Sequence, residues 1–161
     1  MKIRKVTLRH YRVHRALEVT FDDQRTLIAG PNEAGKSTLV EAVHRALFVR
    51  HKSTTDLQRI RSRSVSAWPE VGLEFHAGEH EWTLRKVFKG AQGSIASLIN
   101  DTTGERWDGD AAEEKLRELL DVEDLGPQRS KQQWAHLWVW QGTARDNPTS
   151  SDVIGHAAVA L

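Results

Sequence analysis

The chain has 161 residues, with 23 lysines and arginines against 22 aspartates and glutamates, and a formal net charge of +1. This length suits one domain with a sizeable core, and the ordinary apolar and charged content excludes a disordered chain. The lack of cysteine excludes disulfides, a thiol nucleophile and a zinc site of cysteines, which fits a cytoplasmic protein.

The near-zero charge means that any binding to nucleic acid would depend on a local basic patch. No stretch approaches the roughly 20 apolar residues of a membrane span, and the N-terminus lacks the apolar core of a signal peptide. No membrane association is therefore expected.

The first third of the chain predicts strands that lead to a helix. Strands are expected over residues 3–8 and 17–21, with a basic turn over 9–15 between them. Residues 26–29 form a short apolar run that is expected to be another strand. From residue 37 to about 49 the apolar residues recur at helical spacing, which predicts a helix.

The middle of the chain predicts an antiparallel β-meander. A polar and basic stretch over 50–66 precedes alternating patterns at 71–75 and 82–88, and residues 94–100 complete the meander as a third strand. Glycines supply the turns. A helix is expected over 110–120.

The last part of the chain predicts shorter elements. Residues 129–136 are expected to form a helix, and residues 137–140 a short strand that leads to Gln141. Residues 151–161 resemble the first turns of a further helix, with their apolar side chains on one face.

Residues 30–37 read GPNEAGKS, a complete match to the phosphate-loop pattern GxxxxGK[ST]. Its glycines allow close backbone approach, and its amides can surround phosphate oxygens at the positive end of the next helix. Lys36 can reach the β- and γ-phosphates, and the Ser37 hydroxyl can ligate Mg²⁺. The alternative is a glycine turn that contains Lys-Ser by chance, and the strand–loop–helix context argues against it.

Three segments carry a resemblance to a known family. Residues 2–12, 19–21 and 27–42 resemble the N-terminus of SMC-like ABC ATPases, a group that includes the chromosome-maintenance proteins, RecF, RecN, SbcC and the ATPase of double-strand-break repair. The form GPNEAGKSTLVEA is especially similar to SbcC-like and AAA-23 or AAA-27 type repair ATPases. Residues 138–142, WVWQG, sit where this family has its Q-loop.

The resemblance implies an α/β P-loop NTPase fold, an ABC-type lobe I with a mixed sheet and an antiparallel β-meander, and the cofactors ATP and Mg²⁺. Gln141 would ligate Mg²⁺ together with Ser37, and Arg12 would contact phosphate. The bland alternatives are a polar residue that ends a strand and a solvated turn arginine. The implied nucleotide-binding residues are Gly30, Asn32, Glu33, Ala34, Gly35, Lys36, Ser37, Thr38, Arg12 and Gln141.

An ABC head also needs a Walker B strand, a signature loop and a switch histidine. Residues 119–124 approach the Walker B pattern, but they follow helical spacing and lack four consecutive apolar residues. In the family these motifs lie in a C-terminal lobe beyond a coiled coil. The resemblance therefore implies that residues 1–161 are an N-terminal lobe, inactive alone, with residues 151–161 starting the helix toward the coiled coil.

The expected partners are the C-terminal lobe of the same protein and a second ATPase head that engages in an ATP-dependent way, with DNA and a nuclease subunit as further candidates. The competing functions are a non-catalytic nucleotide-binding scaffold and a P-loop kinase, while the absence of Asn-Lys-x-Asp argues against a GTPase. The basic stretch over 50–63 is either a DNA-backbone contact or a solvated loop. The eight histidines show no metal-binding spacing.

Overall fold

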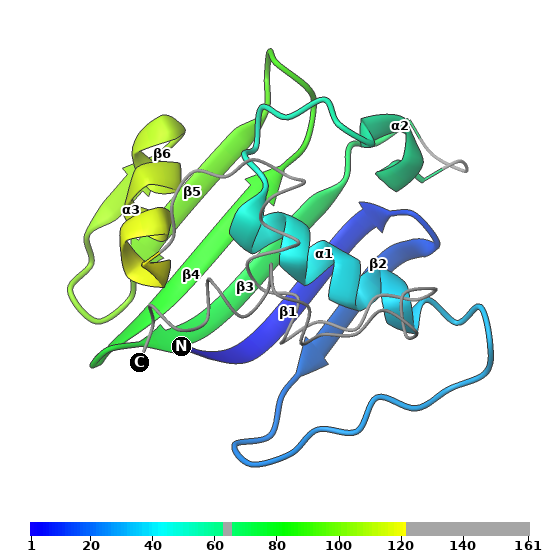
Figure 1. The fold of residues 1–161 in the computed structure, drawn as a ribbon, viewed down its shortest axis with the longest axis horizontal. Coiled ribbons are helices and arrows are strands. Elements are labelled where there is room, and N and C mark those ends of the chain that lie inside the picture. The colour runs from blue at the N-terminus through cyan, green and yellow to red at the C-terminus, as the bar shows by residue number, and fades with distance from the viewer. Residues whose placement is uncertain (63–65, 122–161) are drawn as a thin grey trace, which may run out of the picture. The chain divides into compact units, whose positions relative to one another are not determined.

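The structure is a computed structural model that describes residues 1–62 and 66–121. Its core is a six-stranded sheet in the order β2-β1-β3-β4-β5-β6, in which every neighbouring pair is antiparallel (Figure 1). The elements in chain order are β1 (Lys2–Tyr11), β2 (His14–Thr20), α1 (Lys36–Phe48), α2 (Leu57–Ile60), β3 (Glu70–Ala77), β4 (His80–Val87), β5 (Ile95–Asn100), β6 (Arg106–Asp108) and α3 (Asp110–Leu120).

Two helices cover one face of the sheet. Helix α1 contacts β1, β3 and β4, and helix α3 contacts β5 and β6, so both lie in front of the sheet in Figure 1. The core lies between these layers, where alternate strand side chains meet the apolar stripe of α1. Its fully or almost fully buried members include Val6, Leu8, Leu39, Ala46, Leu73, Phe75, Leu84, Leu98 and Leu116.

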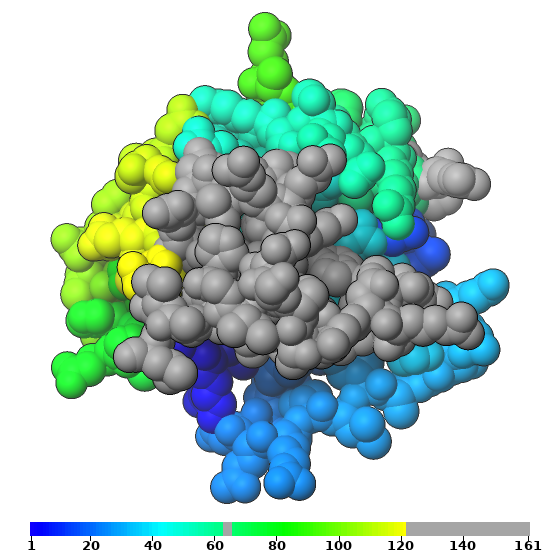
Figure 2. Space-filling view, in the orientation of Figure 1, coloured from blue at the N-terminus to red at the C-terminus, as the bar shows by residue number. Residues whose placement is uncertain are grey.

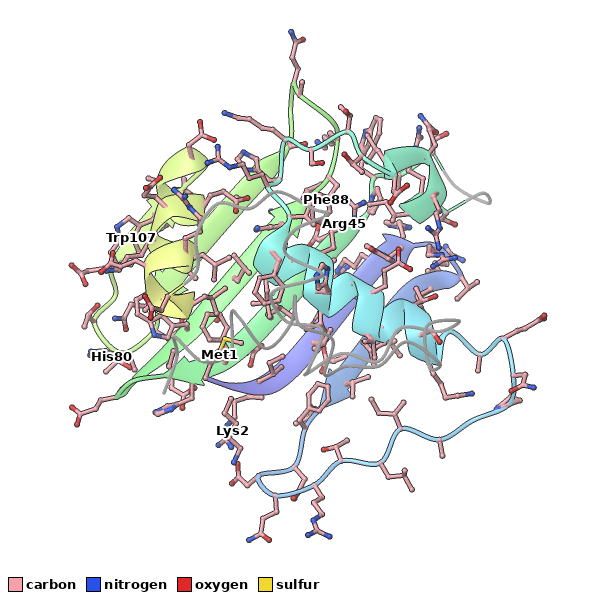
Figure 3. The ribbon with its side chains drawn as sticks, viewed as in Figure 1. Met1, Lys2, Arg45, His80, Phe88 and Trp107 are labelled. Atoms are coloured by element: carbon pink, nitrogen blue, oxygen red, sulfur yellow. The ribbon has the colours of Figure 1, made fainter. Side chains whose placement is uncertain are left out.

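One tryptophan side chain from β4 and one from β6 lie beside each other near α3. Trp82 is buried, as its strand position predicts, and its ring centroid lies 5.8 Å from that of Trp107. The ammonium of Lys115 in α3 lies 5.6 Å from the Trp107 ring, a cation–π arrangement. Figure 3 labels Trp107 beside α3, and Arg45 and Phe88 beside α1, where the guanidinium of Arg45 lies 5.5 Å from the centroid of the Phe88 ring.

The α/β lobe and its antiparallel meander, which the sequence predicts, are confirmed. The helix expected over 37–49 is α1 to within one residue at each end, and the helix expected over 110–120 is α3. Strand β1 is longer than expected, because it continues to Tyr11 and pairs there with His14 of β2. The basic turn expected over 9–15 is therefore only the two residues Arg12 and Val13.

The strand expected over residues 26–29 is wrong. The chain from residue 21 to the start of α1 has no strand in the described structure and swings away from the sheet (Figure 1). Leu27 is 89% exposed, and the blue atoms of this stretch gather along the lower margin of the space-filling view (Figure 2). A strand needs a neighbour for its backbone hydrogen bonds, and none of the described strands lies beside this stretch. The described sheet is accordingly antiparallel rather than mixed.

Several predicted elements lie outside the described residues. These are the helix over 129–136, the strand over 137–140, Gln141, and the helix start over 151–161. Within residues 1–62 and 66–121, no helix has the length and apolar character needed to span a membrane.

Candidate nucleotide-binding site

The glycine loop, residues 30–35, joins the exposed stretch after β2 to the N-terminus of α1. Gly35 is the N-cap of α1, with φ at 89°, and its carbonyl accepts the first helical hydrogen bond from Leu39 N–H at 3.0 Å. A φ of this sign favours glycine, because a Cβ would crowd the backbone. Glu33 has φ at 66°, so two left-handed residues bend the loop around the end of the helix.

Lys36 opens α1 and folds its side chain back over the loop. Its ammonium donates hydrogen bonds of 2.7 Å to the carbonyls of both Gly30 and Pro31. An ammonium has three donors, and these two bonds hold it at the mouth of the loop. The positive charge therefore lies beside the backbone of the glycine loop.

The first turn of α1 combines an exposed hydroxyl with a positive field. Ser37 is exposed and Thr38 is buried, so of these two only the serine faces solvent at the helix end. The first turn contains no acidic residue, and the helix dipole adds positive potential there. The amides of the first helical turn, a lysine and this potential together favour a polyanion such as a phosphate chain.

Arg12 reaches α1 from the connection between β1 and β2. Its guanidinium forms an ion pair with the carboxylate of Glu41 in the second turn of α1. This contact brings Arg12, which the resemblance assigns to phosphate contact, to the helix that begins at the glycine loop. The Arg12 side chain is 30% exposed, and its contact with phosphate stays a prediction.

His14 also touches the loop, and the sequence analysis did not select it. Its Nε2 atom lies 3.2 Å from the carbonyl oxygen of Gly35. Glu41 was missed as well, although it lies inside the family-like segment. The contact of His14 is non-local and follows from the pairing of β1 with β2, so no pattern in the sequence indicates it.

The basic stretch over 50–63 is partly engaged within the domain. The ammonium of Lys52 lies 2.6 Å from the carboxylate of Asp110, and the guanidinium of Arg61 lies 4.1 Å from the ring of Trp68. These two cations therefore have intramolecular partners. Among the described residues no group of three or more histidines, aspartates or glutamates could hold a metal ion.

The sequence is similar to proteins of DNA repair and to uncharacterised mycobacterial proteins. It is 29% identical over 123 residues to the uncharacterised protein Rv1278 of Mycobacterium tuberculosis, covering 74% of this chain and 14% of that protein. It is 34% identical over 88 residues to a DNA double-strand break repair Rad50 ATPase of Thermoplasma acidophilum, covering 53% and 9%. A DNA replication and repair protein RecF of Exiguobacterium is 28% identical over 99 residues, covering 61% and 27%. The chain thus spans only a small part of these relatives.

The fold is similar to a solved structure from work on the ATP-driven dimerization and DNA-stimulated activation of SMC ATPases. The TM-score is 0.61 at 15% identity, and the match covers 99% of this chain and 98% of the other. The family model described as AAA_23, an AAA domain, matches residues 5–136. The chain therefore belongs to the AAA_23 family, and it is an N-terminal head region of the SMC-like ABC ATPase type.

Proposed function

We propose that this chain is the ATP-binding N-terminal lobe of an SMC-like ATPase that works in DNA repair or chromosome processing. The observation that carries the proposal is the ammonium of Lys36, held 2.7 Å from two carbonyls of the glycine loop at the N-terminus of α1. In that place it adds a point charge at the N-terminus of a helix, which suits the β- and γ-phosphates of ATP.

The residues of the loop fit a phosphate chain with a divalent cation. The amides from Asn32 to Ser37 would surround the phosphate oxygens, with Gly30 and Gly35 allowing the close approach. Ser37, exposed at the first turn, would ligate Mg²⁺, and Gln141 would supply a second ligand. Bound Mg²⁺ would neutralise charge on the β- and γ-phosphates. Arg12 would add a further positive charge beside α1.

The proposed partners follow from what the relatives are. The Rad50 and RecF relatives are named for DNA repair, and the SMC structure was described for ATP-driven dimerization and DNA-stimulated activation. We infer that a C-terminal lobe of the same protein completes this head, that two heads engage across ATP, and that DNA and a nuclease subunit are further partners. Residues 151–161 would start the helix toward a coiled coil, and the protein would act in the cytoplasm.

Calorimetric titration of the chain with a non-hydrolysable ATP analogue and Mg²⁺ tests the proposal. Lys36→Ala should weaken binding at least tenfold, since it removes a charge-assisted contact of about 1.5–3 kcal/mol. Ser37→Ala should weaken binding only when Mg²⁺ is present. Lys52→Ala is the matched control, because Lys52 is exposed beyond the opposite end of α1. Equal affinity in the wild type and in Lys36→Ala would overturn the proposal.

The non-catalytic scaffold remains the second candidate function. It shares the phosphate site and differs only in turnover, so binding alone does not separate the two. A head completed with its C-terminal lobe that binds ATP but releases no phosphate would favour the scaffold.

A further inference from the structure

The connection between β1 and β2 packs directly against the second glycine of the phosphate loop. A Cβ placed on Gly35 would overlap the imidazole of His14 and would lie 2.8 Å from Cγ2 of Val13, closer than real Cβ atoms approach other atoms. The glycine at this position is therefore required by a neighbouring element as well as by its own φ of 89°. The β1–β2 turn, residues 11–14, thus rests on the glycine loop.

The turn is held in an unusual backbone conformation. Arg12 is the first residue of a two-residue connection and has φ at 50°, a position that glycine or asparagine ordinarily occupies in such hairpins. A non-glycine residue in this conformation is strained, and such residues concentrate at functional sites. Its side chain uses this conformation to pair with Glu41 of α1. The strain is therefore associated with a contact to the helix of the phosphate loop.

The turn is also fixed on its other side. The N–H of Arg12 donates to the carbonyl of Ile60 at 2.8 Å, and the carbonyl of His10 accepts from the N–H of Ser62 at 3.2 Å. Tyr11 is fully buried and forms a bridge with Arg61. Because β1 lies inside the sheet between β2 and β3, the turn has little freedom to move. The turn can therefore hold the glycine loop, which is itself exposed, in one position.

The contact of His14 controls the direction of one peptide group. A carbonyl oxygen only accepts, so the 3.2 Å contact with Gly35 requires a proton on Nε2. The peptide unit that follows Gly35 is planar and trans, so its carbonyl and the N–H of Lys36 point in opposite directions. When His14 and Leu39 hold this carbonyl toward the helix, the N–H of Lys36 points out of the helix end. That is the direction from which a phosphate would approach.

We propose that His14 is a positioning residue of the nucleotide site, which holds the Gly35 carbonyl so that the amide of Lys36 is aimed at the phosphate chain before ATP arrives. His14 lies on a turn that the Arg12–Glu41 ion pair fixes to the same helix, α1. The effect of His14 on ATP affinity rests on the proposed function. The positioning of the Gly35 carbonyl by His14 is a property of the nucleotide-free chain and does not depend on it.

Two substitutions at position 14 separate the hydrogen bond from the volume of the ring. His14→Leu fills the space of the ring with an apolar side chain that has no donor. His14→Gln keeps an N–H donor at a similar reach from the backbone. His76→Leu is the matched control, because His76 pairs with Lys2 at the opposite end of β1 from the turn. All variants are made in the full chain.

The first measurement needs no nucleotide. Nitrogen-detected NMR of the wild type should show a proton on Nε2 of His14, and amide exchange should be faster over residues 35–38 in His14→Leu. His14→Gln and His76→Leu should exchange as the wild type does, and residues 43–47 of α1 should be unchanged in every variant. A deprotonated Nε2, or unchanged exchange in His14→Leu, would overturn the inference even if the chain binds ATP.

The second measurement is affinity for an ATP analogue with Mg²⁺. His14→Leu should bind about fivefold more weakly, the equivalent of about 1 kcal/mol for one neutral hydrogen bond, and His14→Gln should recover most of this loss. Equal affinity in His14→Leu would refute the role in binding. A wild type that does not bind at all would refute the proposed function instead, and the exchange measurement would still decide whether His14 positions the loop.

Discussion

The ammonium of Lys86, which is fully buried, donates a hydrogen bond of 2.7 Å to Oε2 of Glu113. The second carboxylate oxygen accepts from the backbone N–H of His51 at 2.7 Å and lies 3.0 Å from the Nδ1 atom of the same residue. Lys86 also donates to the carbonyl of Val49 at 3.1 Å. These contacts join β4, α3 and the chain that leaves α1, so buried charges fix the C-terminal end of the phosphate-loop helix.

We expect Glu113→Gln to lower the free energy of unfolding by about 3–5 kcal/mol. The substitution keeps the shape of the side chain but leaves the ammonium of Lys86 buried without an opposing charge, and losing one partner of a buried pair typically costs this much. Urea unfolding followed by circular dichroism measures the change.

Glu118→Gln is the control for this substitution. Glu118 lies on the same helix, 2.9 Å from Lys115, but its side chain is 69% exposed. Solvent screens such pairs, so the unfolding midpoint should stay within the error of the wild type. Equal effects of the two substitutions would mean that the buried pair contributes nothing beyond a surface pair.

Stability should depend on pH through Lys86. Burial lowers the pKa of Lys86 below its ordinary value, Glu113 opposes this shift, and Arg50 adds to it. Between the lowered pKa and the ordinary value, the unfolded chain binds a proton that the folded chain does not. Stability arising from this group therefore rises with pH through that window and is level below it.

The comparison of Glu113→Gln with the wild type isolates this dependence. Without the carboxylate, the pKa of Lys86 should fall further, so the rise in stability should begin at a lower pH in the variant. The difference in unfolding free energy between the two proteins should consequently shrink toward alkaline pH. The other titrating groups are the same in both proteins, so their contributions cancel in this difference. A difference that is constant with pH would contradict the assignment.

Gly35→Ala should be more damaging than an ordinary substitution of a left-handed glycine. Gly78→Ala supplies the comparison, because Gly78 also has a positive φ, at 63°, but a Cβ there meets no atom within 4 Å. Gly78→Ala should cost only the backbone strain, of about 1–2 kcal/mol. Gly35→Ala adds the overlap with His14 and Val13, so its melting temperature should be lower still.

The double variant Gly35→Ala with His14→Ala tests whether the overlap is responsible. Removing the imidazole relieves one collision and leaves the φ of 89° and the contact with Val13. The double variant should therefore melt between the wild type and Gly35→Ala. Additive losses from the two substitutions would argue that the turn and the loop do not touch.

Periodicity predicted those parts of the fold whose side chains alternate between a core and solvent. Helices α1 and α3 and the strands of the meander have such patterns, and their ends were identified to within two residues. Helix α2 has four residues and β6 three, which is too short for a period to emerge. The apolar run at 26–29 was read as a strand, but strand formation depends on a neighbour that local sequence does not reveal.

Only part of the candidate site could be predicted from the sequence. The loop over 30–37 has a motif whose residue types follow from phosphate chemistry, and Arg12 followed from the resemblance. The contact of His14 with Gly35 joins positions 21 residues apart, and that of Arg12 with Glu41 joins positions 29 residues apart. Both contacts therefore form only once the β1–β2 hairpin has folded. The sequence analysis did not select Lys86 and Glu113, because burial of a charge depends on a partner that is distant in sequence.

The last prediction is that this chain alone binds ATP but does not turn it over. Phosphoryl transfer depends on positioning and on charge stabilisation around the γ-phosphate and the attacking water. Among the described residues, the carboxylate of Glu41 in the second turn of α1 is paired with Arg12. Single contacts made in the transition state are worth roughly 10²–10³ in rate each, so without the motifs of a C-terminal lobe the loss should reach several orders of magnitude. A phosphate-release assay on the chain, and then on the chain mixed with the C-terminal lobe of the same protein, measures this. Release should appear only in the mixture and should vanish with Lys36→Ala, whereas full turnover by the chain alone would place a catalytic carboxylate within these 161 residues.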